Sequence, residues 1–236
     1  PHNTTIRGAF DIALHDIAAR VAGLPLYRYF GGWKRPLETD LTIPIARLVA
    51  DRFRDLDPPH RLCYFANAYR AVTPQRGELR EFGQAGVELI GVPGPEGTAE
   101  VVELLDRSLT AVGLDEAVIG LGEDGLWTAL LQDAGAGPET IELSSELLVS
   151  HDLVGVERAL AESDELDPEA IGQAATLIQL RGGAEVLEAA RGLGGQGFAV
   201  VLERLEENFR AITDRVSSRS VLLDLGMLRE IGYYSG

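Results

Sequence analysis

The stretch YRAVTPQRGELREFGQAGVELIG, residues 69–91, predicts two β-strands around a polar loop. Side chains alternate between the two faces of a strand, so every second residue of the second strand shares one face. The residues of that face are Arg80, Phe82, Gln84, Gly86 and Glu88. Such a row suits a small zwitterion, because a carboxylate can hold an ammonium group and arginine can bind an anionic group. We therefore interpret this stretch as the best candidate for a binding site.

The composition predicts a folded globular protein without membrane or nucleic-acid partners. The chain has 236 residues, 45% of them hydrophobic, which is enough for one large domain or two small ones. No apolar run is long enough to span a membrane, and the N-terminal PHNTTIRGAF lacks the regions of a signal peptide, so we expect a cytoplasmic protein. The formal charge of −16 disfavours binding to a phosphate backbone.

The residue types that often carry catalysis are scarce in this chain. Cys63 is the single cysteine, and its apolar neighbourhood RLCYFANAY predicts a core thiol rather than a nucleophile. Lys34 is the single lysine, which leaves little room for lysine-based catalysis. The histidines are far apart and lack the spacing of metal ligands, so we predict no metal site. They are His2, His15, His60 and His151.

Hydrophobic spacing divides the rest of the chain into helices and strands. We expect helices around residues 10–21, from Pro44, after the turn PGPEG, and from 198 to 212. Most of 126–190 is also expected to be helical, with breaks at Gly135–Pro138 and around Asp167 and Pro168. The helix after PGPEG carries a predicted apolar stripe of Val101, Leu104, Leu105 and Leu109. Further strands are expected around Tyr64 and in AVIGLG and SVLLDLG. The Gly-rich GLGGQG is interpreted as a connector, because it lacks the strand and helix context of a dinucleotide site and the lysine and hydroxyl of a P-loop. Strands without regular alternation with helices indicate an α+β fold on an antiparallel sheet.

Four segments resemble the catalytic core of histidyl-tRNA synthetases and, within that superfamily, most closely the regulatory subunit of ATP phosphoribosyltransferase. They are DLTIPIARLVA, the stretch at 69–91, VGLDEAVIGLGEDGLWTALL and LDLGMLREIGYYSG, which together extend over most of residues 40–236. The resemblance implies a class II aminoacyl-tRNA synthetase-like antiparallel sheet with flanking helices. It also implies a core at 41–236 with a helical insertion at about 126–190. Both ends of the chain look like fragment ends.

The resemblance also implies a pocket for histidine. It assigns Gln84 and Glu88 as histidine contacts and Tyr233 and Tyr234 as the lining of the ring pocket. The residues it places at the α-amino end of histidine are Asp40 and Thr42. Arg229 stands where the synthetases place their activating arginine. Arg70 and Arg80 are possible anion contacts. The residues alone leave another reading open, in which Arg80 pairs with Glu88 across the strands and the tyrosines pack the sheet edge.

Departures from the synthetase pattern fall on the nucleotide side of the pocket. Val72 stands where the resemblance places a glutamate that contacts adenine, and Glu78 stands where it places a second phosphate-binding arginine. A carboxylate at that position repels a triphosphate. Glu230 and Gly232 also replace a small residue and an aspartate of the histidine-binding signature. We therefore expect no ATP activation.

The first forty residues follow a different pattern. TTIRGAFDIALHDIAARVAGLPLYRYFGGWKRP resembles the helix that precedes the barrel in the enolase superfamily, near the mandelate-racemase and dipeptide-epimerase branches. The catalytic lysines of such enzymes would come later, and the chain has no lysine after Lys34. We expect residues 1–40 to be a fused or foreign segment with a junction near Asp40.

These expectations combine into one leading function and two alternatives. The leading one is a non-catalytic regulatory subunit of histidine biosynthesis that needs no cofactor, binds histidine and forms a hetero-oligomer with the short catalytic ATP phosphoribosyltransferase. One alternative is a degenerate or truncated histidyl-tRNA synthetase. The other is a composite fragment without native activity, whose incomplete sheet leaves its edges exposed.

Overall fold

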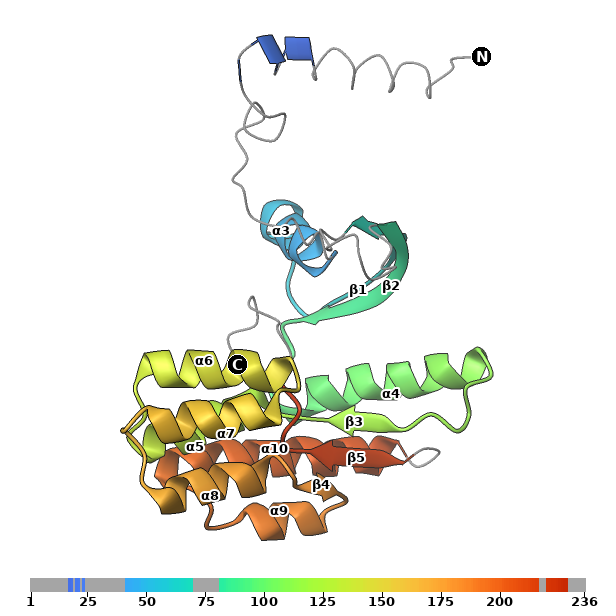
Figure 1. Ribbon diagram of the computed structural model, residues 1–236. Helices are drawn as coiled ribbons and strands as arrows, with labels where there is room; N and C mark the ends of the chain where they lie inside the picture. Colours follow the sequence, from blue (N-terminus) through green and yellow to red (C-terminus); the bar gives the residue numbers. More distant parts are fainter. Residues whose placement is uncertain are drawn as a thin grey trace, which may run out of the picture. The chain divides into compact units, whose positions relative to one another are not determined.

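The computed structural model describes residues 17, 18, 20, 21, 23, 41–69, 81–216 and 220–228. The chain consists of two compact units, residues 1–88 and 89–236. Figure 1 shows a short helix and a pair of strands in the first unit, and a cluster of helices around a small sheet in the second. The junction expected near Asp40 lies outside the described residues and stays a prediction.

The first unit contains the predicted pair of strands. Strand β1 is His60–Tyr69 and strand β2 is Glu81–Ile90, and the two form a two-stranded sheet. Tyr69 contacts Glu81 at one end, while Tyr64 lies against Gly86 further along, so the strands run in opposite directions. The quoted stretch begins only at the last residue of β1. The strand expected around Tyr64 and the first strand of that stretch are therefore one element.

The two faces of this sheet differ in exposure. Even-numbered residues of β2 are partly buried, and Ala68 of β1 is fully buried on the same side. Odd-numbered residues face the solvent, and 85% of the surface of Phe65 is exposed. Cys63 is exposed too, so the prediction of a core thiol is wrong. The apolar residues around Cys63 do not alternate with polar ones, so the sequence did not show which face of the strand is buried. Cys63 is at an odd position of β1, on the face exposed to solvent.

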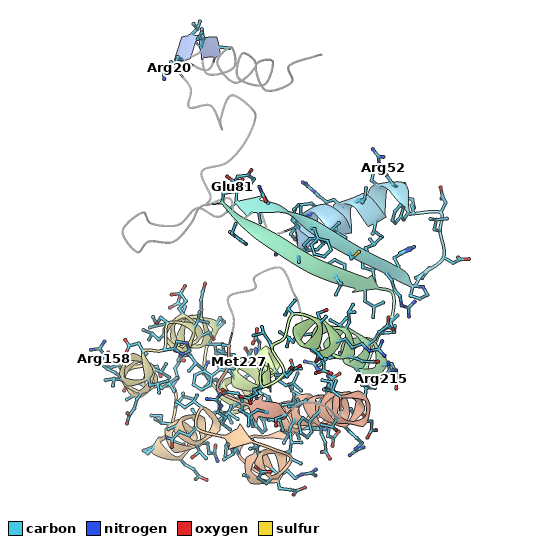
Figure 2. All side chains as sticks on the ribbon, turned by 90° about the vertical axis from the view of Figure 1, so that its right-hand side faces the viewer. Arg20, Arg52, Glu81, Arg158, Arg215 and Met227 are labelled. Carbon is cyan, nitrogen blue, oxygen red and sulfur yellow. The ribbon has the colours of Figure 1, made fainter. Side chains whose placement is uncertain are left out.

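Helix α3, Thr42–Arg52, belongs to the same unit as the sheet. Its N-cap residue, Leu41, donates its backbone N–H to Oε1 of Gln84 in β2 over 3.2 Å. At its other end the ring of Phe53 lies 5.8 Å from that of His60 in β1, centre to centre. Figure 2 shows α3 along the strands, with Arg52 and Glu81 toward opposite ends. The helix begins two residues before Pro44, which is tolerated in a first turn because its N–H needs no partner there.

The second unit contains most of the helices. Its elements are α4 Pro95–Ala111, β3 Ile119–Leu121, α5 Asp124–Asp133, α6 Pro138–Val149, α7 Leu153–Glu162, α8 Pro168–Leu177, β4 Arg181–Gly182, α9 Glu185–Ala190, α10 Gln196–Arg215 and β5 Val221–Asp224. Both predicted breaks between helices are confirmed. Pro138 and Pro168 each occupy the first turn of a new helix, where proline is favourable, and the Asp167 carboxylate caps the second of these helices by accepting from Ala170 N–H.

The sheet of the second unit has the order β3–β5–β4. Strand β5 pairs with β3 in parallel, with Gly120 opposite Leu222, and with β4 in antiparallel fashion. A parallel pair needs a long connection, which the helices between β3 and β5 supply. The sheet is therefore mixed rather than purely antiparallel. Strand β4 was not predicted, because a strand of two residues is too short to show alternation of polar and apolar side chains.

The main hydrophobic core joins helices α5 to α10 with strand β5. Its largest fully buried side chains include Trp127, Phe198 and Leu205. The Trp127 indole N–H donates to Oγ of buried Ser144 over 3.3 Å, so this polar atom is satisfied inside the core. A second cluster forms where α4, α10 and the sheet meet, and consists of Ala99, Ile119, Ile212 and Val216.

Helix α4 differs from its prediction on one face. Leu104 and Leu105 were expected in a buried stripe, but 43% and 47% of their surfaces are exposed. The side that is buried includes Ala99 and Asp106, two turns apart. Val101 and Leu109 of the predicted stripe are partly buried, and Leu109 packs against the second cluster. The stripe is therefore only half correct, because the spacing of apolar residues contains no information on the neighbouring helix α10.

Helix α10 begins inside GLGGQG. Gly192–Gly195 connect α9 to α10 as predicted, and α10 starts at Gln196, two residues before the expected start of this helix. Asp133 at the end of α5 accepts the backbone N–H of Phe198 at 2.8 Å. A Cβ added to Gly197 would lie 2.7 Å from Oδ1 of Asp133, so only glycine lets the carboxylate approach this closely. The carboxylate also lies at the positive end of the helix dipole.

Replacing Asp133 tests this link between α5 and α10. Asp133→Ala leaves an N-terminal amide of α10 without its acceptor and should lower the free energy of unfolding by about 1 kcal/mol, the usual cost of losing an N-terminal cap. Urea unfolding followed by circular dichroism measures the change. Asp133→Asn retains an oxygen acceptor and should lose less, and Glu203→Ala on the exposed side of α10 is the control. An Asp133→Ala variant as stable as the control would show that the link contributes nothing.

Replacing Gln84 tests the attachment of α3 to β2. Gln84→Met keeps the length of the side chain but removes the acceptor, whereas Gln84→Glu keeps an oxygen that can accept from Leu41. Since a hydrogen bond contributes about 1 kcal/mol, the Leu41 amide should exchange about fivefold faster in the methionine variant. Hydrogen exchange read by NMR gives the rates. Equal Leu41 rates in both variants would contradict the role of the side-chain oxygen.

Candidate functional site

The structure describes three of the predicted site residues. Gln84 and Glu88 lie on β2, and Thr42 is the first residue of α3. The others lie outside the described residues: Asp40, Arg70, Arg80, Arg229, Tyr233 and Tyr234. Val72, Glu78, Glu230 and Gly232 lie outside them as well, so their predicted roles stay predictions.

The three described residues share one side of the first unit. Gln84 and Glu88 are both on the partly buried face of β2, four residues apart, as the alternation predicted. The bond from Leu41 N–H to Gln84 brings the start of α3 to this face, and Thr42 follows Leu41 directly. All three side chains keep partial contact with solvent. The face therefore combines an amide and a carboxylate that a small polar ligand can reach, and Thr42 begins the helix beside it.

A fourth residue of this face was missed by the sequence analysis. Tyr64 of β1 lies across Gly86, which is midway between Gln84 and Glu88. A Cβ added to Gly86 would lie 2.3 Å from both Cζ and Oη of Tyr64 and 2.8 Å from Cε2. The end of the phenol ring thus covers the glycine. The pairing of Tyr69 with Glu81 fixes this register, and counting inward from that pair would have placed Tyr64 opposite Gly86.

The opposite face of the sheet has a polar cluster of its own. Glu81 Oε1 accepts from Nδ2 of Asn67 at 2.8 Å and from the hydroxyl of Tyr69 at 3.2 Å. The hydrogen bond and the negative charge of Glu81 raise the pKa of the Tyr69 phenol, because ionisation would place two anions together. These residues are exposed at odd positions, on the side away from Gln84. They brace the two strands rather than extend the candidate site.

The second unit offers an apolar hollow rather than a chemical site. An open depression beside the start of α4 is lined by Leu89, Val92, Gly94, Gly97, Thr98, Val101 and Val102. None of these side chains is a carboxylate, an imidazole or an amine, so the described lining supplies no general acid or base of these types. In the described ranges, histidine, cysteine, aspartate and glutamate form no group of three or more that could bind a metal. None of the helices described is both long and apolar enough to cross a bilayer.

The chain matches the protein-family model described as histidyl-tRNA synthetase over residues 36–236. Among curated proteins, the ATP phosphoribosyltransferase regulatory subunit of Desulforamulus reducens is 40% identical over 85% of this chain and 50% of its own length. The protein of the same name from Moorella thermoacetica is 38% identical over 85% of this chain and 51% of its own. The chain thus spans about half the length of these relatives.

Solved structures show the same fold. A crystal structure of an ATP phosphoribosyltransferase regulatory subunit/histidyl-tRNA synthetase from Bacillus halodurans C superposes with a TM-score of 0.76 at 32% identity, over 85% of this chain and 52% of that one. A chain of the ATP phosphoribosyl transferase (HisG:HisZ) complex from Thermotoga maritima superposes with a TM-score of 0.59 at 18% identity, over 80% of this chain and 66% of that one. The sheet predicted to resemble class II synthetases is thereby confirmed. This chain belongs to the histidyl-tRNA synthetase family.

Proposed function

We propose that this chain is part of a regulatory subunit of ATP phosphoribosyltransferase, which assembles with the short catalytic subunit and has no catalysis of its own. One observation carries the proposal. The family model is named for histidyl-tRNA synthetase, but curated relatives that are 31–40% identical to this chain are named ATP phosphoribosyltransferase regulatory subunit. The solved HisG:HisZ complex has the same fold and supports a hetero-oligomer. A subunit of a biosynthetic enzyme would work in the cytoplasm.

The ligand of the proposed subunit is histidine, bound on the face of β2. Glu88 offers a negative charge for an ammonium or imidazolium group, and Gln84 and Thr42 add neutral polar groups beside it. The bond between Leu41 and Gln84 holds the two parts of this site together before any ligand arrives. Asp40, Arg229, Tyr233 and Tyr234 would complete the pocket by the family resemblance, with Arg70 and Arg80 as possible anion contacts.

The proposed lack of catalysis rests on two residues of the sequence between β1 and β2. Val72 cannot make the adenine contact of the synthetase pattern, and Glu78 adds a negative charge where a triphosphate would need a positive one. At about 4 Å and an effective dielectric constant near 20, two like charges repel by about 4 kcal/mol, enough to oppose ATP binding strongly. The amino-acid side of the pocket keeps its polar groups, so binding without activation is the function that these residues support.

A truncated synthetase is the second candidate, because the fold is compatible with it. Superposition on a histidyl-tRNA synthetase from Nostoc with a TM-score of 0.68 shows that the framework suits either role. The two candidates differ in a measurable reaction, since a synthetase exchanges pyrophosphate with ATP when histidine is present. The proposed regulatory subunit should show no such exchange above the level of a buffer control. Exchange that depends on histidine would decide for the synthetase.

Thermal unfolding with histidine tests the proposed ligand. Histidine at ten times its Kd adds about 1.4 kcal/mol of stability and should raise Tm by about 3 to 5 °C for a chain of this size. Glu88→Gln removes the charge and should abolish most of the rise. Glu81→Gln makes the same change on the opposite face of β2 and should retain the rise. If millimolar histidine leaves Tm of the unaltered chain unchanged, the proposed site is wrong.

Co-purification tests the proposed partner. The chain, expressed together with the short catalytic subunit from the same genome, should elute with it in a single peak on size exclusion, and light scattering should give a mass above that of either protein. An unrelated protein of similar size and charge is the control, because a formal charge of −16 can attract basic proteins without specificity. Separate elution of the two proteins at physiological salt would contradict assembly through this part of the subunit.

A further inference from the structure

We propose that Tyr64 is a specificity-determining residue of the amino-acid site, whose phenol ring stacks against a planar side chain of the bound ligand. The inference rests on the proposed binding of histidine and adds the residue that would recognise its ring. Neither the family resemblance nor the row of polar residues on β2 pointed to this tyrosine. It follows from the position of its ring over Gly86.

The ring lies across the strand rather than beside it. Cζ, Oη and Cε2 of Tyr64 would all fall within 2.8 Å of a Cβ on Gly86, which requires the end of the phenol to cover the space above this residue. Real Cβ atoms do not approach other atoms so closely, so the arrangement exists only because residue 86 is glycine. Tyr64 remains partly exposed, which leaves some of its surface accessible to a ligand.

The ring occupies the middle of the candidate site. Gln84 and Glu88 are each two residues from Gly86, or about 7 Å along an extended strand. A ligand that reaches both the amide and the carboxylate must therefore pass over the position of the phenol. The surface that it meets between these two polar groups is aromatic.

An aromatic surface at this place favours ligands with a flat ring. Stacked or edge-to-face aromatic pairs gain affinity beyond the area that they bury, by about two- to tenfold. A protonated imidazole would also be attracted to the negative face of the phenol ring. A small aliphatic amino acid of the same charge gains neither effect. Tyr64 would thus distinguish histidine from alanine, because only histidine carries a ring that can stack on the phenol.

Two substitutions perturb the ring in different ways. Tyr64→Leu removes it, and Tyr64→Phe keeps the ring without the hydroxyl. Gly86→Ala leaves Tyr64 in the sequence but adds the Cβ that its ring cannot tolerate, so the ring must move. The ring is the end of a side chain and can swing away without a change in the backbone. Gly83→Ala is the matched control on the same strand, since a Cβ there meets nothing within 4 Å.

Titration of the full chain with histidine and with alanine, followed by calorimetry, tests the proposal. Tyr64→Phe and Gly83→Ala should bind histidine within about twofold of the unaltered chain. Tyr64→Leu and Gly86→Ala should bind it about two- to tenfold more weakly, with little change for alanine. The imidazole protons of bound histidine should shift upfield in NMR spectra of the unaltered chain, and this shift should vanish in Tyr64→Leu.

Two failures can be told apart. If the unaltered chain does not bind histidine, the proposed function is wrong and this inference falls with it. If it binds histidine, but Tyr64→Leu and Gly86→Ala keep its affinity and the upfield shift, the ring only packs the sheet and this inference alone is overturned. Should Tyr64→Leu fail to fold by circular dichroism, Gly86→Ala decides by the same criteria.

Discussion

The register between β1 and β2 is the constraint on which the candidate site depends. Contacts of Tyr69 with Glu81, and of Tyr64 with Gly86, hold the strands in one alignment. A slip by one residue would turn every side chain of a strand to the other face. It would then separate Gln84 from the start of α3 and remove the tyrosine ring from the glycine. The site is therefore a property of the pairing as well as of the residues that it contains.

Local patterns predicted the parts of the structure that depend on local physics. Alternation placed Gln84 and Glu88 on one face, and prolines at positions 138 and 168 marked where helices begin. The errors concern contacts between distant segments. The exposure of Cys63 and Leu104 depends on which face another element covers, and the parallel pairing of β3 with β5 joins residues about one hundred positions apart. Periodicity contains no information on such neighbours.

The second unit obtains its stability from its core more than from its charges. Trp127, Phe198 and Leu205 are almost completely buried, and the indole of Trp127 has a hydrogen-bond partner inside the core. The ion pairs on α10, such as Arg204 with Glu123, lie near the surface, where a pair contributes at most about 1 kcal/mol. A fold held by apolar packing tolerates changes of surface charge. This tolerance allows one framework to serve both synthetases and regulatory subunits.

A regulatory site and a synthetase site have different physical requirements. A synthetase must bind its amino acid and also stabilise the transition state of adenylate formation, for which it needs groups that hold the phosphates of ATP. A regulator needs only a difference in affinity between two states of its assembly. In the proposed site, the carboxylate of Glu88 and the amide of Gln84 would meet the second requirement by binding a ground-state amino acid. The side-chain amide of Gln84 also accepts a hydrogen bond from the N–H of Leu41, the N-cap residue of α3. A ligand that competes for this amide would therefore change how α3 is held against β2.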